Sequence, residues 1–136
     1  MKSTRSLERA IHNSSNPSLL DGEDFSLPAL SDYLQDQLRQ RGVPLKDVIR
    51  RCNLDRSYGY QLFNGTRRPT RDVLMTLSLE LGLREQDAQR LLQLAGRAPL
   101  YVRCRRDAAV FYGLSHHLSS AEVHDLLLEL GEPGLF

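Results

Sequence analysis

The fold is decided by one stretch, Leu45-Lys-Asp-Val-Ile-Arg-Arg-Cys-Asn-Leu-Asp-Arg-Ser-Tyr-Gly-Tyr-Gln-Leu-Phe-Asn-Gly-Thr-Arg-Arg-Pro69. Its first part carries apolar residues at the spacing of one helix face, namely Leu45, Val48, Ile49 and Cys52. Asn53 tolerates the left-handed backbone of a sharp turn, and Asp55 is a good N-cap for a second helix. Gly65 supplies the usual stop at the end of that helix. The stretch therefore predicts two short helices joined by a tight turn, with a basic loop after them.

The outward residues of the second helix have side chains that suit the edges of DNA bases. Arginine pairs with guanine, glutamine pairs with adenine, and serine serves either base. The candidates for base contacts are Arg56, Ser57, Tyr58, Tyr60 and Gln61. Polar and basic residues around them suit contacts to phosphate oxygens. The candidates for phosphate contacts are Lys46, Arg50, Asn64, Thr66, Arg67, Arg68 and Arg71. This is the layout of a helix-turn-helix whose second helix, residues 56–64, enters the major groove.

Here the chain resembles the lambda-repressor-like (Xre/Cro) helix-turn-helix family. The interval from Leu54 to Gly65 matches the family's spacing between the turn and the end of the recognition helix. Leu62-Phe63-Asn64-Gly65 is similar to the end of that helix, and a proline such as Pro69 is a common family feature. The resemblance covers residues 28–83 and implies a five-helix DNA-binding unit. It also implies base contacts from the recognition helix and phosphate contacts from Asn64 and the loop after it.

Two residues depart from the family pattern. Gly59 stands where the family places a branched aliphatic that faces the core. A glycine there weakens the helix by about 1 kcal/mol and removes a packing contact, unless Tyr58 or Tyr60 turns inward and fills the gap. Leu45 stands where family members carry a polar residue that contacts phosphate, and Lys46 is expected to take over that role.

Composition and charge bound the protein's class. The 136 residues fit one domain with a short extension, and their net charge is only +1. Between Lys46 and Arg71, however, seven basic residues face two acidic ones, a local balance of +5. From Leu118 onward the local balance is −4. This asymmetry favours a DNA-binding face at one end and a solvated or partner-binding surface at the other.

Other classes of function lack support in the sequence. The cysteines, Cys52 and Cys104, form no C-x-x-C and are expected as small buried hydrophobes within helices, in a reducing compartment. No segment is long and apolar enough for a membrane span or a signal peptide, so a cytoplasmic protein is expected. No nucleotide-binding, hydrolase or metalloprotease motif occurs, so neither an enzyme nor a cofactor is expected. The histidines at 116, 117 and 124 are expected to be solvated rather than to bind a metal.

Three regions are expected along the all-α chain. Residues 1–26 are polar and predict a flexible arm, in which Leu7, Ala10 and Ile11 could form one or two amphipathic turns. Residues 27–96 contain the five helices of the DNA-binding unit, the first over 28–41, the fourth capped by Thr70. Residues 97–136 predict a C-terminal helical hairpin that packs on this unit.

The last 67 residues contain a candidate internal repeat. A shift of 35 residues gives eight identities among 31 positions, from 70–100 onto 105–135, without a gap. The identical residues include Arg71-Asp72 with Arg106-Asp107, and Gly96 with Gly131. This alignment predicts a second helical hairpin, over 103–115 and 120–130, with a capping box at its second helix. Two unrelated hairpins of similar length would also align tolerably, so the sequence leaves duplication open.

Two functions are consistent with these features. The first is a sequence-specific regulator that binds double-stranded DNA as a homodimer on a palindromic site, because one module buries little surface. The second is an antitoxin-like or adaptor protein that keeps the helix-turn-helix as a scaffold and binds a protein partner through the C-terminal hairpin. Near-neutral charge, Gly59 and the surface tyrosines favour the second. Leu128, Leu135 and Phe136 are expected at the dimer or partner contact.

Overall fold

The computed structural model describes residues 3–21 and 30–136. Within these ranges every regular element is helical. The elements are α1 (Thr4–Asn13), the 3-10 helix η1 (Pro17–Asp21), α2 (Leu30–Arg41), α3 (Leu45–Arg51), α4 (Arg56–Phe63), α5 (Arg71–Glu80), α6 (Glu85–Leu94), α7 (Arg105–Ser115) and α8 (Ser120–Glu129). The all-α fold class is confirmed. No helix in the described ranges is long and apolar enough to cross a membrane.

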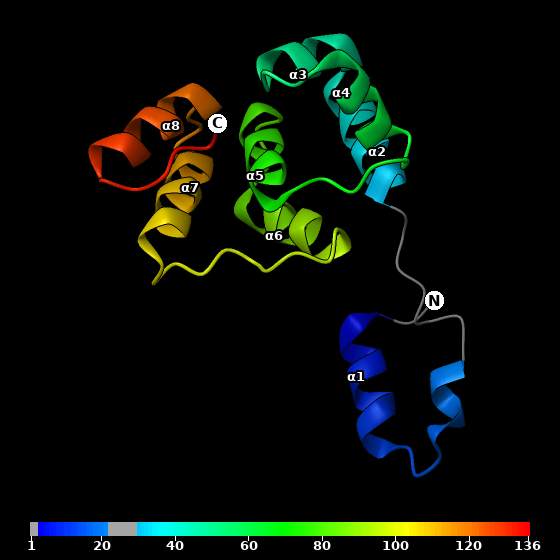
Figure 1. The fold of residues 1–136 in the computed structure, drawn as a ribbon. Coiled ribbons are helices and arrows are strands. Elements are labelled where there is room, and N and C mark those ends of the chain that lie inside the picture. The colour runs from blue at the N-terminus through cyan, green and yellow to red at the C-terminus, as the bar shows by residue number, and fades with distance from the viewer. Residues whose placement is uncertain (1–2, 22–29) are drawn as a thin grey trace.

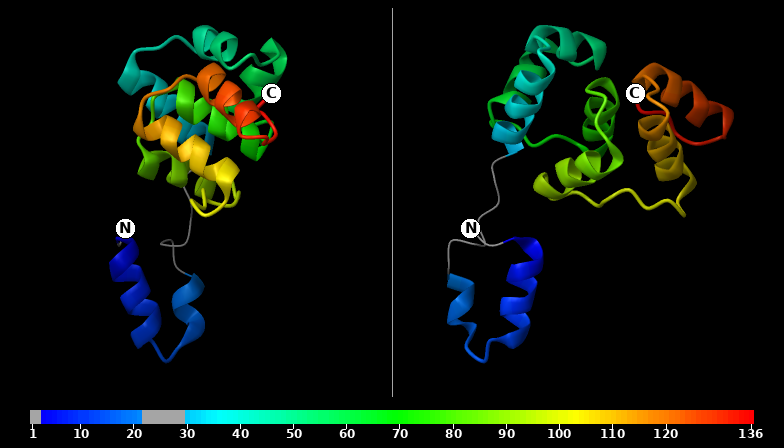
Figure 2. Two further views of the ribbon diagram at one scale, coloured as in Figure 1. Left: turned by 90° about the vertical axis from the view of Figure 1, so that its left-hand side faces the viewer. Right: turned by 180° about the vertical axis from the view of Figure 1, so that it is seen from behind.

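The helices from α2 onward form three consecutive layers (Figures 1 and 2). The α5–α6 hairpin lies in the middle, with α2, α3 and α4 on one side and the α7–α8 hairpin on the other. One continuous apolar core runs through all three layers. Its fully buried members include Leu34, Phe63, Leu77, Leu91 and Leu127. The C-terminal hairpin therefore packs on the α5–α6 hairpin as a part of the same core.

The turn between α3 and α4 has the local structure that the sequence predicts. Asn53 adopts a left-handed backbone with φ 56°. The carboxylate of Asp55 caps α4 by accepting a hydrogen bond from the N–H of Tyr58 at 3.1 Å. Gly65 follows the end of α4 with φ +83°, a conformation that favours glycine. These three residues fix the direction in which α4 leaves α3.

Gly59 allows α3 and α4 to approach closely. A Cβ at this position would lie 2.7–2.9 Å from three side-chain carbons of Ile49. Ile49, only 4% exposed, occupies the space beside Gly59, and Tyr58 packs partly against the core. Tyr60 stays exposed and Tyr58 is half-buried. Residue 59 thus contributes no side chain to the core, and in its place the side chain of Ile49 on α3 packs directly against the backbone of α4.

The N-terminal segment has more structure than a flexible arm with one or two turns. A ten-residue helix, α1, begins after the N-cap Ser3, and η1 lies beside it (Figures 1 and 2). None of the residues of α1 is buried. The rest of the expected arm, residues 22–26, lies outside the described residues, as do residues 28 and 29 of the first expected helix.

The 35-residue repeat is visible in the structure. Shifted by 35, the bounds of α6 coincide with those of α8, and α5 coincides with α7 except at its first residue. Gly96 and its counterpart Gly131 both have positive φ, as do Gly82 and its counterpart His117. Ser119 and Glu122 form the predicted capping box at the start of α8. The two hairpins therefore share their helix lengths and turn conformations.

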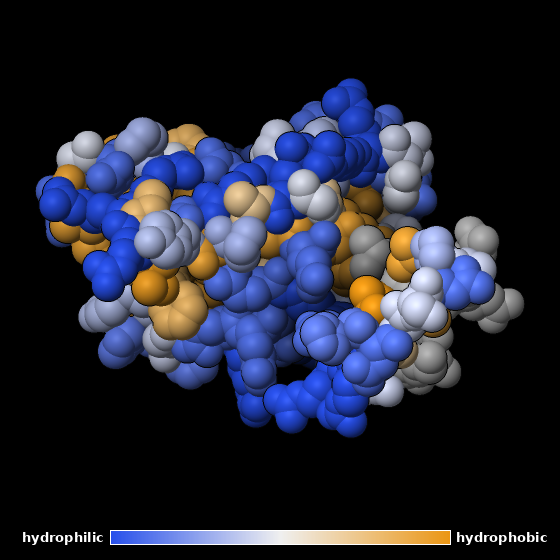
Figure 3. All heavy atoms as spheres, turned by 90° about the horizontal axis from the view of Figure 1, so that it is seen from below, coloured by the Kyte–Doolittle hydropathy of each residue, from blue (hydrophilic) through white to orange (hydrophobic). Residues whose placement is uncertain are grey.

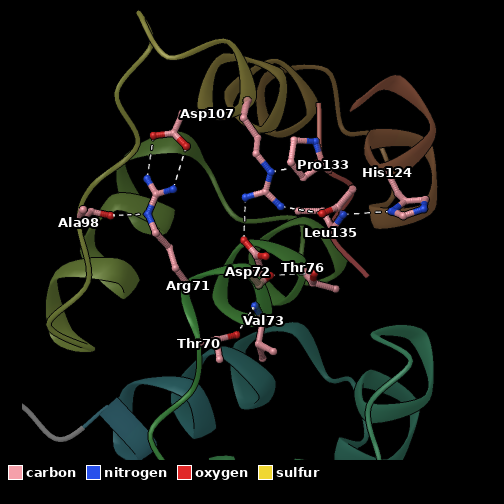
Figure 4. A network of polar contacts seen from close by, with 12 residues as sticks. Thr70, Arg71, Asp72, Val73, Thr76, Ala98, Asp107, His124, Pro133 and Leu135 are labelled. Atoms are coloured by element: carbon pink, nitrogen blue, oxygen red, sulfur yellow. Dashed lines mark hydrogen bonds and ion pairs between the residues drawn. The ribbon is translucent and has the colours of Figure 1, made fainter. Parts of the chain in front are cut away.

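The two hairpins are joined by a reciprocal pair of ion pairs (Figure 4). Arg71 of α5 binds Asp107 of α7 at 2.7 Å, and Arg106 of α7 binds Asp72 of α5 at 2.8 Å. Each arginine also donates to two carbonyls that follow its own hairpin. These carbonyls belong to Ala98 and Pro99 for Arg71, and to their counterparts Pro133 and Gly134 for Arg106.

Two further contacts repeat this reciprocity. The carboxylate of Glu80 accepts hydrogen bonds from the N–H and hydroxyl of Ser120, and the carboxylate of Glu85 accepts from the hydroxyl of Ser115. Residue 80 is the counterpart of 115, and 85 is the counterpart of 120. In each of these contacts the counterparts swap places, so that one hairpin contacts the other in the same way in both directions. This indicates an approximate two-fold axis between the hairpins, whereas successive units of an open repeat array are related by a translation. The pair of hairpins is thus a closed unit.

Two expectations about buried and exposed residues are wrong. Cys104 is exposed and stands just before α7, because the N–H of Cys104 bonds to the carbonyl of Tyr101 in a turn that delays the helix. Cys52 is buried, as expected. Leu135 is only 7% exposed and belongs to the core, so it cannot contact a partner. Leu128 and Phe136 are exposed.

Candidate nucleic-acid interface

A hollow of about 400 Å³ lies between α3 and the outward face of α4. Basic side chains line it together with apolar ones. Its lining consists of Lys46, Ile49, Arg50, Leu54, Arg56 and Tyr60. The guanidinium of Arg56 lies 5.8 Å from the ring centroid of Tyr60, within the range of a cation–π contact. The hollow therefore combines positive charge with a flat aromatic surface and an apolar floor.

The remaining candidates on α4 continue this surface. Ser57 is exposed, and Tyr58 and Gln61 are half-buried. The guanidinium of Arg67, from the loop after α4, lies 5.6 Å from the ring centroid of Tyr58. This second arginine–tyrosine pair connects the helix to the loop. The structure thus brings the five candidate base contacts and Arg67 together on one surface.

The loop after α4 is held by its own residues. The side-chain oxygen of Asn64 accepts hydrogen bonds from the N–H and the hydroxyl of Thr66, and the N–H groups of Thr66 and Arg67 point to the carbonyl of Gln61. Asn64, Thr66 and Arg67 are all exposed. Asn64 and Thr66 therefore shape the loop that presents Arg67 to solvent.

Arg68 and Arg71 differ from the other candidates because they bind within the protein. Arg68 donates to the carbonyls of Ala95 and Gly96 at 3.0 and 2.9 Å, and its side chain reaches across to the end of α6 while the residue stays exposed. The guanidinium of Arg71 donates four hydrogen bonds, two to Asp107 and two to backbone carbonyls. A guanidinium has five N–H donors, so Arg71 has almost no capacity left for a phosphate. Contrary to the prediction from the sequence, Arg71 is therefore not a candidate for phosphate contact.

The two acidic residues on this surface do little to reduce its positive charge. The carboxylate of Asp55 is engaged as the N-cap of α4. Asp47 pairs with Arg50 at 3.3 Å, but the side chain of Arg50 is 76% exposed. Exposed pairs of this kind are weak, and a phosphate can replace the carboxylate. Lys46, Arg50, Arg56 and Arg67 thus remain able to bind an anion.

Sequence reasoning missed Ile49 and Leu54 as part of this surface. Both belong to the apolar positions that predict the core, and Ile49 is indeed buried. They form the floor of the hollow because Gly59 brings α3 against α4. A glycine on the core side of a helix was the signal that could have indicated this close approach.

The histidine-rich part of the chain forms no metal site among the described residues. The ring of His116 lies 4.1 Å from that of Tyr112, and the ring of His124 stacks on Phe136 at 4.3 Å. The Nδ1 atom of His124 accepts a hydrogen bond from the N–H of Leu135 at 3.0 Å. His124 therefore has a structural role, in which it fixes the C-terminal segment to α8.

Comparison with known proteins identifies no protein that is similar to this chain. No protein-family model matches the chain, and neither a curated protein nor a solved structure is significantly similar to it. The assignment of a function therefore depends on the residues and geometry of this chain.

Proposed function

We propose that this protein is a sequence-specific regulator that binds double-stranded DNA through α4. In this proposal α3 and α4 are a helix-turn-helix of the lambda-repressor-like type, and α4 lies in the major groove. Arg56, Ser57, Tyr60 and Gln61 contact base edges, and Tyr58 borders them. Lys46, Arg50 and Arg67 contact phosphates, and Arg68 contacts a phosphate with the guanidinium N–H groups that its two bonds to Ala95 and Gly96 leave free.

The observation that carries the proposal is the shared surface of α4, the hollow beside it and the loop after it. Three basic side chains that remain able to bind an anion flank a short helix whose outward residues are polar, basic or aromatic. Lys46 and Arg50 come from one side of that helix, and Arg67 comes from its C-terminal end. Phosphates on both sides of a groove would find partners, while the helix between them reads the bases.

The division of roles predicts how variants lose affinity. Arg56→Ala or Gln61→Ala should weaken binding to the preferred site by about 1–3 kcal/mol and relax the preference at one base position. Arg67→Ala should weaken binding to all sequences alike and reduce the salt dependence of the affinity. Arg105→Ala is the matched control, because Arg105 is exposed on α7 in the outer layer. Equal losses from Arg56, Gln61 and Arg67 on cognate and random DNA would contradict these roles.

The first test is selection of binding sites from a pool of random duplex DNA at moderate salt, with the full-length chain. Enrichment of one short sequence supports the proposal, and a palindromic sequence would support a homodimer. Retention that is equal for all sequences and disappears with salt would indicate a generic DNA binder. If no DNA is retained at any salt, the proposal fails, and the chain is then better explained as an adaptor that uses α3 and α4 as a scaffold.

A further inference from the structure

The α7–α8 hairpin has an uncovered face whose counterpart on the α5–α6 hairpin is covered. The helices α2 and α3 pack against α5 and α6, whereas α7 and α8 form the outer layer (Figure 2, left). Leu77 is fully buried, while its counterpart Tyr112 is 50% exposed. Ala95 is 6% exposed, and its counterpart Leu130 is 40% exposed. The two hairpins therefore differ in burial: helices cover this face of α5–α6, whereas no described helix covers the same face of α7–α8.

This uncovered face is apolar and aromatic. Beside Tyr112 and Leu130 it includes the half-buried residues Phe111 and Leu126, which are counterparts of Thr76 and the fully buried Leu91. We call Phe111, Tyr112, Leu126 and Leu130 the α7–α8 open face. In Figure 3, apolar side chains reach the surface at the left-hand end, over the part of the molecule that contains these helices. An exposed patch that matches a buried one by symmetry indicates a missing partner.

The covered counterpart shows what chemistry such a partner needs. Arg41 of α2 donates to the carbonyl of Leu81 at the end of α5, and Arg68 donates to the carbonyls at the end of α6. Cations are favourable there because the C-terminal end of a helix is negative. On the open face the corresponding ends belong to α7 and α8, and Glu129 and Glu132 add negative charge. The partner should therefore be an apolar helix with basic residues.

The chain contains a helix with these properties. Leu7, Ala10 and Ile11 lie on one face of α1, yet none of them is buried, and Ile11 is 44% exposed. The helix carries Arg5, Arg9 and His12 and a single acidic residue, Glu8. A ten-residue helix is marginal in water without a packing partner. In this structure α1 lies away from α7 and α8 (Figure 1), and among the described residues it lies next to the short η1 alone, with Ile11 near Leu19 and Leu20.

We propose that α1 docks on the α7–α8 open face. The apolar face of α1 covers Tyr112, Leu126 and Leu130, and Arg5 and Arg9 approach the C-terminal end of α8 with Glu129 and Glu132. The contact is the counterpart of the packing of α2 on α5–α6. It is independent of the DNA-binding surface, which lies on the other side of the α5–α6 layer (Figure 1).

The test is amide hydrogen exchange of the full-length chain, followed for the residues of α1. Docking predicts that these amides exchange at least about tenfold more slowly than in an unstructured peptide. In Leu130→Glu, the α1 amides should exchange as fast as those of an unstructured peptide. Leu128→Glu is the matched control, because Leu128 lies on the same helix, is 55% exposed, and has the exposed Gln93 as its counterpart. Both side chains are exposed, so slow exchange in α7 and α8 should persist in both variants.

A charge variant tests the electrostatic part. Arg9→Glu should raise the exchange rate of α1 as Leu130→Glu does, since it places a carboxylate near Glu129 and Glu132. If the protection of the α1 amides is independent of protein concentration, α1 docks within its own chain. If the protection grows with concentration, α1 docks on a second copy. Either result supports the contact. Exchange of α1 at peptide rates in the unmodified protein would overturn the proposal, and so would equal effects of the changes at Leu128 and Leu130.

Discussion

The reciprocal ion pairs allow one prediction with an internal control. Asp107→Ala should destabilise the protein much more than Asp72→Ala, although the two residues occupy corresponding places in the contact between the hairpins. Asp107 is 5% exposed and accepts three hydrogen bonds, from both terminal nitrogens of Arg71 and from the N–H of Tyr101. The side chain of Asp72 is 45% exposed and accepts one, from Arg106.

The magnitudes follow from this difference in burial. Removal of one partner of a buried ion pair costs about 3–5 kcal/mol, because the other charge stays behind without its partner. An exposed pair contributes about 1 kcal/mol or less. Both carboxylates lie in the first turn of their helices, so the contribution of the helix dipole is similar and largely cancels in the comparison. We therefore expect losses of about 3–4 kcal/mol for Asp107→Ala and about 1 kcal/mol for Asp72→Ala.

The assay is urea denaturation of the full-length chain, with the free energy of unfolding obtained by linear extrapolation. The double variant Arg71→Ala, Asp107→Ala should lose clearly less than the sum of the single variants, because the two side chains interact directly. Equal losses for the two aspartates would refute the argument from burial. Additive losses for Arg71 and Asp107 would refute the coupling.

Three further predictions follow from single residues. Burial raises the pKa of Asp107, but hydrogen bonds from Arg71 and the N–H of Tyr101 outweigh it and hold the pKa below its usual value. The ionised Asp107 carboxylate therefore stabilises the fold fully above pH about 4, and this contribution is lost as the pH falls through the lowered pKa. The difference in unfolding free energy between the unmodified protein and Asp107→Asn should shrink as the pH is lowered in this range. Burial raises the pKa of the Cys52 thiol to about 12, so a thiol reagent should modify only the exposed Cys104 in the native protein and both cysteines in urea. Gly59→Ala should destabilise the fold by about 1–2 kcal/mol, because the new Cβ overpacks against Ile49 and the gain in helix propensity offsets only part of that cost. In a double-variant cycle measured by thermal unfolding, Gly59→Ala should carry no such penalty when Ile49→Ala is also present.

Local rules predicted the helices well because their ends are fixed by nearby residues. Asp55, Thr70 and Ser119 each accept a hydrogen bond from a backbone N–H three residues later, as capping residues should. Gly65 and Gly96 provide the left-handed conformations after α4 and α6. None of these features depends on a distant part of the chain, so each can be recognised from a few consecutive letters.

Most candidate site residues lie together on the surface of α4 and its loop, and the exception, Arg71, is decided by a tertiary contact. Arg67 and Arg71 look alike in the sequence, since both follow α4 and neither lies in an apolar stripe. Their difference depends on Asp107, which lies 36 positions after Arg71. The repeat held a clue, because Arg71-Asp72 recurs as Arg106-Asp107. Only the arrangement of the two hairpins shows that each arginine binds the carboxylate of the other hairpin.

The sequence differences between the two hairpins have a physical consequence in the contacts between them. Glu80 meets Ser120, and Glu85 meets Ser115. If two copies of the α5–α6 hairpin paired in the same way, Glu80 would face Glu85 of the other copy at both places, and like charges would oppose the pairing. The serines of α7–α8 remove this repulsion, so the face of α5–α6 favours an α7–α8 hairpin over a second α5–α6 hairpin. If the proposed regulator binds palindromic DNA as a homodimer, we expect the dimer to form through a surface other than this face of α5–α6, which α7–α8 covers.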